Sequence, residues 1–343
     1  MAAAEPPSQT PAPENPHDVA DFIAPEDDGE LEKGPNFLDT ASEKGSSTNS
    51  LSSSILNYQY ENGRRYHAYR EGEYIAPNDD REQDRLDLNH HIYRLIVGGA
   101  LTRAPIGPNP RRVLDLGTGT GIWAIEMADE FPNSTVIGTD LSPIQPRWVP
   151  PNCYFEVDDY ESEWDFSRSF DLVHGRGMLG TLRNPQEFFQ QALKNLKPGG
   201  WMELVDTTPE AFSDDDTIRS APHIVDWARL SNEASIEFGK QLNIPHLYKG
   251  WMEEAGFKNV REEVYKCPLN PWAKDRKMKE LGAYQQANTL EGMETYTLAL
   301  LTRALGWRAE EVQIFLSGVR NELLNRKLHL YVKTYFVYGQ KEA

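Results

Sequence analysis

The sequence predicts an α/β protein built on a doubly wound, mostly parallel sheet of seven strands. Two observations lead to this fold class. From residue 112 onward, short apolar runs alternate with stretches whose apolar residues recur at helical spacing. The first run ends in a turn with glycine at every second position, residues 117–121. Repeated units of this kind give a parallel sheet whose ligands bind beyond the carboxyl ends of the strands.

Each predicted strand is a short apolar run that ends at a polar or turn residue. Asp140 follows the second strand, the pair Asp158–Asp159 follows the third, and His174 follows the fourth. The last strand alternates in polarity and closes the sheet. The seven predicted strands are Val113–Leu116, Thr135–Thr139, Tyr154–Val157, Phe170–Val173, Trp201–Val205, Phe257–Tyr265 and His329–Tyr338.

Helices are predicted between these strands and on both sides of them. Asn78 is the expected cap of a first helix from about Asp79 to Val97. Asn184 and Pro185 open a later helix with a cap and a proline at its first position. The other predicted helices begin at Ile122, cover residues 217–240, and extend over Met278–Leu305 and Ala309–Lys327.

The charge of the chain is uneven. Residues 1–50 hold eleven acidic side chains and two lysines, and so carry half of the formal net charge of −18. Residues 1–54 are rich in proline and then in serine, and we expect this leader to be disordered because it has little apolar surface to bury. The acidic excess argues against binding to nucleic-acid phosphates or anionic lipid.

The two cysteines, Cys153 and Cys267, are too few for a disulfide framework or a cysteine-based metal site, and no metal is expected. No apolar run approaches the roughly 20 residues that span a bilayer, and the amino terminus lacks the pattern of a secretory signal. The expectation is a cytoplasmic or nuclear protein without a membrane partner.

The glycine turn indicates the chemistry of the ligand. Glycine removes Cβ atoms beneath a ligand, and the following helix offers unpaired N–H groups. Asp140 is placed to accept both hydroxyls of a ribose. The spacing is G-x-G-x-G rather than the G-x-G-x-x-G of dinucleotide sites, and Asp115 would repel a pyrophosphate but suits an ammonium group. S-adenosylmethionine has the required ribose, adenine and amino-acid parts, whereas a nicotinamide cofactor is disfavoured.

With these features, the chain resembles the class I S-adenosylmethionine-dependent methyltransferases, a Rossmann-like fold. The residues that carry the resemblance are VLDLGTGTG (113–121), Asp140, the acid pair 158–159 and LKPGGW (196–201). The resemblance implies that Asp115 and the turn, with Gly117, Thr118, Gly119 and Gly121, hold the methionine end. It implies that Asp140, followed by Leu141, binds the ribose. Asp159 or Asp158 would bind the adenine amino group beside the backbone of Tyr160, and Tyr66 is a further candidate in the segment that precedes the domain.

Flanking sequences narrow the resemblance to the fungal LaeA-like methyltransferases, which include regulators and enzymes of secondary metabolism. The matching stretches are residues 61–79, 82–95, HGRGM (174–178), 271–307 and YVKTYFVYGQK (331–341). The implied methyl acceptor is a small secondary metabolite or a protein partner, and a regulatory protein complex is a further expected partner. The alternative function is a regulatory or scaffold subunit that uses the fold with incidental or no turnover.

The expected domain organisation has three parts. Residues 1–54 form the leader, residues 55–110 an N-terminal helical segment, and residues 111–343 the methyltransferase domain. The helices at about 210–255 and 270–327 exceed the minimal fold, and we expect them to cap the acceptor pocket.

His174 is the candidate catalytic residue, because a histidine at the end of the fourth strand is placed to remove a proton from the acceptor. The alternative is a histidine that shapes the pocket floor through hydrogen bonds. Methyl transfer from a sulfonium also proceeds by positioning alone. His90 and His91 are consecutive on a helix, so at most one of them faces the site. The chain has neither a Pro-Pro-aromatic motif after the fourth strand nor a Pro-Cys pair, so we expect no direct nucleic-acid binding.

Overall fold

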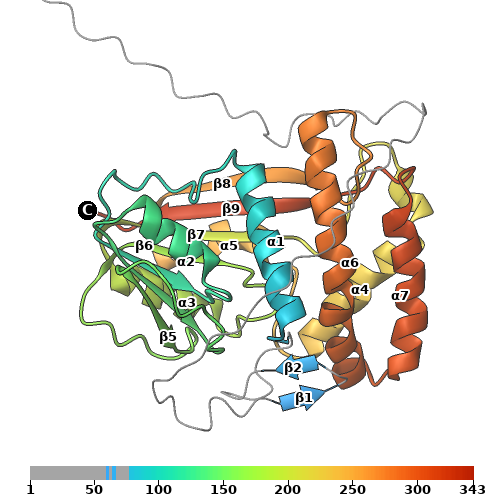
Figure 1. The fold of residues 1–343 in the computed structure, drawn as a ribbon, viewed down its shortest axis with the longest axis horizontal. Helices are drawn as coiled ribbons and strands as arrows, with labels where there is room; N and C mark the ends of the chain where they lie inside the picture. Colours follow the sequence, from blue (N-terminus) through green and yellow to red (C-terminus); the bar gives the residue numbers. More distant parts are fainter. Residues whose placement is uncertain (1–58, 62–63, 67–76) are drawn as a thin grey trace, which may run out of the picture.

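The computed structural model describes residues 59–61, 64–66 and 77–343, and the predicted disordered leader lies outside them. Figure 1 shows a twisted sheet covered by helices, with further helices standing together at one end. The strands are β1 (Gln59–Glu61), β2 (Arg64–Tyr66), β3 (Arg112–Leu116), β4 (Thr135–Asp140), β5 (Cys153–Val157), β6 (Phe170–Arg176), β7 (Leu196–Thr207), β8 (Lys258–Pro268) and β9 (Tyr331–Gln340). The helices are α1 (Asp80–Ile96), α2 (Ile122–Glu130), α3 (Pro185–Asn195), α4 (Pro222–Glu237), α5 (Tyr248–Ala255), α6 (Arg276–Leu305) and α7 (Ala309–Leu324), with short 3-10 turns at Thr217–Ser220 and Pro245–Leu247.

The main sheet has seven strands in the order β5-β4-β3-β6-β7-β9-β8. The strands β5, β4, β3, β6 and β7 are parallel, while β9 pairs antiparallel with both β7 and β8. The order reverses at β3, so the turn after this strand lies at the switch point where α/β sheets bind ligands. The predicted fold class is confirmed.

Helices cover both faces of the sheet because buried residues alternate along each strand. On one face, Val113 and Leu172 pack with Trp123 of α2. On the other face, Leu114 and Val173 pack with the aromatic side chains of α3 and with α5. The sheet therefore presents Asp115, which follows Leu114, to the face covered by α2.

The helices α4, α6 and α7 pack on one another, and α1 lies beside α6. Their shared core includes Leu298 and Leu301 of α6. Helix α5 instead packs against α3, β8 and β9. The region 210–255 thus divides between the helical group at the end of the molecule and the sheet.

Three local features differ from the sequence prediction. Asp79, rather than Asn78, caps α1, because its side chain accepts a hydrogen bond from the backbone N–H of Glu82. Strand β6 continues to Arg176, so His174 lies inside the strand. The N-terminal segment predicted as helical, residues 55–110, contains helix α1 and also an antiparallel pair of strands, β1 and β2.

Candidate active site

The turn after β3 is shaped by its three glycines. Gly117, Gly119 and Gly121 have φ angles of +61°, +59° and +81°, the left-handed region that side chains disfavour. A Cβ on Gly119 would lie 3.3 Å from Leu86 of α1, and one on Gly121 would lie 2.4 Å from Phe155 of β5. The turn therefore packs closely on its neighbours and leaves bare backbone at the carboxyl edge of the sheet.

Asp115 lies beneath this turn and is 2% exposed. Its Oδ2 accepts a hydrogen bond from the Thr118 hydroxyl at 2.5 Å, and its Oδ1 lies 2.8 Å from Nδ1 of His174. The backbone N–H of Thr118 also donates to Thr139 on β4. The structure thus makes Asp115 the internal support of the turn, and its contact with a cofactor ammonium group stays a prediction.

His174 is enclosed rather than open to a ligand. It is 1% exposed, and its ring stacks on the Trp123 ring with centroids 3.7 Å apart and planes at 4°. The next residue across the sheet is Glu203, which is also fully buried and accepts from the backbone N–H groups of Arg103 and Ala104. These contacts favour the structural role of His174 over the catalytic one, and the catalytic role stays a prediction.

Asp140 ends β4 beside the glycine turn. Its Oδ2 accepts the backbone N–H of Gly119 at 2.8 Å, and its Oδ1 accepts that of Ser142 at 2.9 Å. Burial raises the pKa of this carboxyl to about 6, although both hydrogen bonds favour its charged form. Leu141 follows in the same loop, and Gln145 donates to the carbonyl oxygen of Gly119 at 2.7 Å. Turn and acid therefore form one hydrogen-bonded unit.

The end of strand β5 lies next to Asp140 at the end of β4. The backbone N–H of Asp158 donates to the carbonyl oxygen of Asp140. The Asp159 carboxylate accepts the backbone N–H of Glu161 at 2.9 Å, and Asp158 accepts that of Asp159 at 2.8 Å. The Tyr160 ring lies 3.5 Å from the place of a Cβ on Gly117. Tyr160 therefore lies beside the glycine turn and Asp158 beside Asp140, and the adenine role of Asp158, Asp159 and Tyr160 stays a prediction.

Two further groups lie at this edge of the sheet. Arg176 donates to Nδ1 of His90 at 2.7 Å, so His90 carries its proton on Nε2 and donates it to Glu126. Burial, and then the charge of Arg176, lower the pKa of His90 to about 4. His91 lies outside, against the ring of Tyr284. His90 is therefore the buried histidine of the pair and is neutral, while both residues line the cavity described below.

Asp206 is a buried acid that the sequence motifs do not single out. It ends the buried part of β7, is 1% exposed, and accepts from the Tyr248 hydroxyl at 2.7 Å and the backbone N–H of Met178 at 3.1 Å. Burial raises its pKa to about 7. Met178 in turn lies 4.0 Å from the place of a Cβ on Gly117. The available signal was an acid directly after a strand, the same pattern as Asp140.

Tyr66 lies on β2, where the guanidinium of Arg303 on α6 is 5.7 Å from its ring centroid. This contact places Tyr66 beside helix α6, and a role of Tyr66 at the cofactor stays a prediction.

A cavity of about 650 Å³ lies between the second half of α1, the start of α6 and β8. Apolar side chains, among them Leu95, Met278 and Leu281, form part of its lining, together with charged residues such as Arg94 and Lys277. The glycine turn does not contribute to this lining.

No helix in the described residues is long and apolar enough to cross a membrane. Within residues 59–61, 64–66 and 77–343, no group of three or more His, Cys, Asp or Glu side chains is arranged to hold a metal ion. Both cysteines are buried thiols.

The seven-stranded sheet of this order, with a glycine turn and an acid at the ends of adjacent strands, agrees with the class I methyltransferase fold that the sequence predicts. The chain belongs to the family described as "Methyltransferase domain", which matches residues 88–262.

Two curated relatives of this chain are fungal proteins. The chain is 39% identical over 297 residues to methyltransferase pytC of Aspergillus terreus. This match covers 86% of this chain and 92% of that protein. It is 38% identical over 278 residues to the secondary metabolism regulator LAE1 of Cochliobolus heterostrophus, with coverage of 79% and 91%. The predicted relationship to LaeA-like proteins is therefore confirmed.

Among solved structures, the chain is similar to phosphoethanolamine N-methyltransferase 2 of Haemonchus contortus. The sequence identity is 16%, the TM-score is 0.44, and the match covers 79% of this chain and 60% of that one.

Proposed function

We propose that this methyltransferase uses S-adenosylmethionine to methylate a small secondary metabolite. The observation that carries the proposal is the joined unit of the glycine turn and Asp140, at the carboxyl ends of the adjacent strands β3 and β4. The relatives support the metabolic setting, because they are named as methyltransferases and regulators of secondary metabolism.

The residues at the turn fit this cofactor. Three left-handed glycines leave backbone without side chains where a ligand crosses the turn. The Asp140 carboxylate has lone pairs beyond the two that accept backbone N–H groups, and these suit the donated protons of two ribose hydroxyls. Asp115 adds a negative charge below the turn, which favours a cationic ligand. When bound, the cofactor supplies an electrophilic methyl group.

The protein's contribution to the reaction is mainly positioning. His174 is buried against Trp123 and Asp115, so the proposal does not depend on proton transfer by this residue. Orientation of the acceptor in line with the methyl group lowers the barrier without a general base. The 650 Å³ cavity beside α1 and α6 has the size of a small-molecule site but does not border the glycine turn, so we assign no acceptor to it.

The test is cofactor binding measured by isothermal titration calorimetry. We expect micromolar affinity in the wild type and no measurable binding in Gly119→Arg, whose new side chain meets Leu86, or in Asp140→Ala. Gly107→Ala is the matched control, because a Cβ there meets nothing within 4 Å. Wild-type affinity in both site variants would refute the proposal.

The acceptor class is tested with S-adenosylmethionine that carries a labelled methyl group. The enzyme is incubated with a fungal culture extract, which is then separated into small molecules and proteins. Label among the small molecules is the expected result, while label only in protein would identify a protein partner as the acceptor.

The relatives named as regulators support one alternative function, a regulatory subunit with little or no turnover. A variant that has lost cofactor binding distinguishes the two functions. If it still supports metabolite production in cells, methyl transfer is not the function that matters there.

A further inference from the structure

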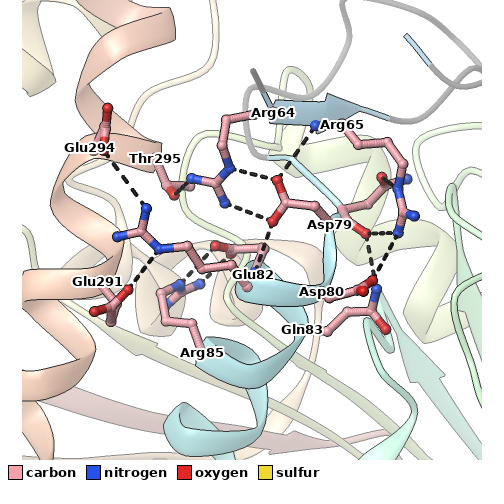
Figure 2. Close-up of polar contacts among 12 residues, drawn as sticks. Arg64, Arg65, Asp79, Asp80, Glu82, Gln83, Arg85, Glu291, Glu294 and Thr295 are labelled. Atoms are coloured by element: carbon pink, nitrogen blue, oxygen red, sulfur yellow. Dashed lines mark hydrogen bonds and ion pairs between the residues drawn. The ribbon is translucent and has the colours of Figure 1, made fainter. Parts of the chain in front are cut away.

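Four residues connect strand β2 to the start of helix α1, and we name them the α1 clamp: Arg64, Arg65, Asn78 and Asp79. Arg64 donates from Nε and Nη2 to the two oxygens of Asp79, at 2.6 and 2.9 Å. Arg65 donates from Nε to Oδ1 of Asn78 at 3.0 Å and from Nη2 to its backbone oxygen at 2.6 Å. Figure 2 shows the two arginines reaching from β2 to the first residues of α1.

The clamp also contacts the helical group. Nη1 of Arg64 donates to the hydroxyl of Thr295 on α6 at 3.0 Å. One turn further along α1, Arg85 pairs with Glu82 and donates to Asn288 of α6 at 2.9 Å. Both charged side chains of this pair are only 3% exposed. Burial of these two charges costs desolvation free energy. The hydrogen bond from Arg85 to Asn288 connects the pair to α6, so the pair fixes α1 against α6.

Asn78 extends the clamp to the cofactor side. It is 4% exposed, and its Nδ2 donates to Oγ of Ser142 at 3.2 Å. The backbone N–H of Ser142 donates to Oδ1 of Asp140. Both ends of the Asn78 amide are therefore used, one by Arg65 and the other by the loop that carries Asp140.

The orientation of the Asp140 carboxylate depends on this loop. One oxygen is fixed by Gly119 of the glycine turn and the other by Ser142. Ser142 is 6% exposed and is held by Asn78 through its hydroxyl and by Gln145 through its carbonyl oxygen. Loss of the Asn78 contact leaves the Ser142 hydroxyl without this donor and loosens one of the two contacts that orient Asp140.

We propose that Asn78 is a positioning residue for the cofactor ribose. Through Ser142 it holds the Asp140 carboxylate in the orientation that receives the ribose hydroxyls, and the clamp connects this orientation to α6. The inference rests on the proposed function, because it takes Asp140 as the ribose acceptor.

The experiment compares two ligands, S-adenosylhomocysteine and its 2′-deoxyribose analogue, by calorimetry. We expect Asn78→Ala and Ser142→Ala each to weaken binding of the full ligand about fivefold to tenfold, the effect of one lost hydrogen bond. Binding of the analogue should weaken less, because it has only its 3′-hydroxyl to donate to Asp140, so the preference for the 2′-hydroxyl falls. The double variant should match either single variant, because both act on one path.

Arg81→Ala is the matched control. Arg81 lies on α1 and pairs with Glu291 of α6 at 2.7 Å, but it is half exposed and does not contact the Asp140 loop. It should leave both affinities unchanged. Thermal unfolding confirms that each variant folds, and Ser142→Ala, which removes only one oxygen, serves if Asn78→Ala does not.

Equal weakening of both ligands, or additive losses in the double variant, would overturn the positioning role. In that case the wild type still binds S-adenosylhomocysteine, and the proposed function stands. A wild type that binds neither ligand overturns the proposed function and this inference with it.

Discussion

Cofactor affinity should fall in acid because of Asp140. Its pKa of about 6 means that about nine-tenths of the carboxyl is ionised at pH 7 and about one-tenth at pH 5. Ribose hydroxyls donate to the ionised form, so the dissociation constant of S-adenosylhomocysteine should rise about tenfold between these pH values. Calorimetry at half-unit steps should place the midpoint near pH 6.

The same pKa shift has the opposite effect on stability. The folded-state pKa lies above the ordinary value of 3.8, so Asp140 lowers stability as the pH rises from about 4 through 6 and restores it on acidification. Weaker binding at pH 5 is therefore not a result of unfolding driven by this group.

Asp140→Asn separates this titration from that of Asp206, whose pKa is about 7. The variant should bind weakly, with an affinity that no longer changes around pH 6. A wild-type affinity that is flat from pH 7 to 5, or an unchanged pH profile in Asp140→Asn, would refute the reasoning.

Two predictions concern stability, both measured by denaturant or thermal unfolding. Gly121→Ala places a Cβ 2.4 Å from the ring of Phe155 in a left-handed backbone and should cost about 2–4 kcal/mol, whereas Gly250→Ala, at an exposed helix position with free space, should be neutral or stabilising. A small loss in Gly121→Ala would show that the turn adapts. Arg85→Met leaves Glu82 buried without its partner and should cost about 3–5 kcal/mol, while the double replacement of both residues by Met should recover much of this. Equal losses in the single and double variants would contradict this account of the pair.

The sheet was predictable because its strands are short apolar runs with clear ends. All seven predicted strands are present, and Asn184 caps α3 as expected, since these signals lie within a few residues of one another. The glycine turn and Asp140 were found for the same reason. Their contact, between residues 21 positions apart, follows from the parallel pairing of two adjacent strands.

The differences come from contacts made across the fold. Asn78 and Asp79 are both good helix caps by composition. Asp79 takes this role, and Asn78 is instead bound to Ser142, 64 positions away. His174 looked like a strand end, but its pairing with Asp115 and its stacking on Trp123 depend on the register of the sheet and the placement of α2. Such contacts between residues far apart in the chain cannot be predicted from the neighbouring sequence.

The most direct test of the central claim is a crystal structure of the protein with S-adenosylhomocysteine. The account predicts the amino-acid part over the bare backbone of residues 117–121, the ribose hydroxyls on the Asp140 carboxylate, and the adenine beside Asp158 and Asp159. A ligand bound elsewhere, or a ribose without contact to Asp140, would contradict it.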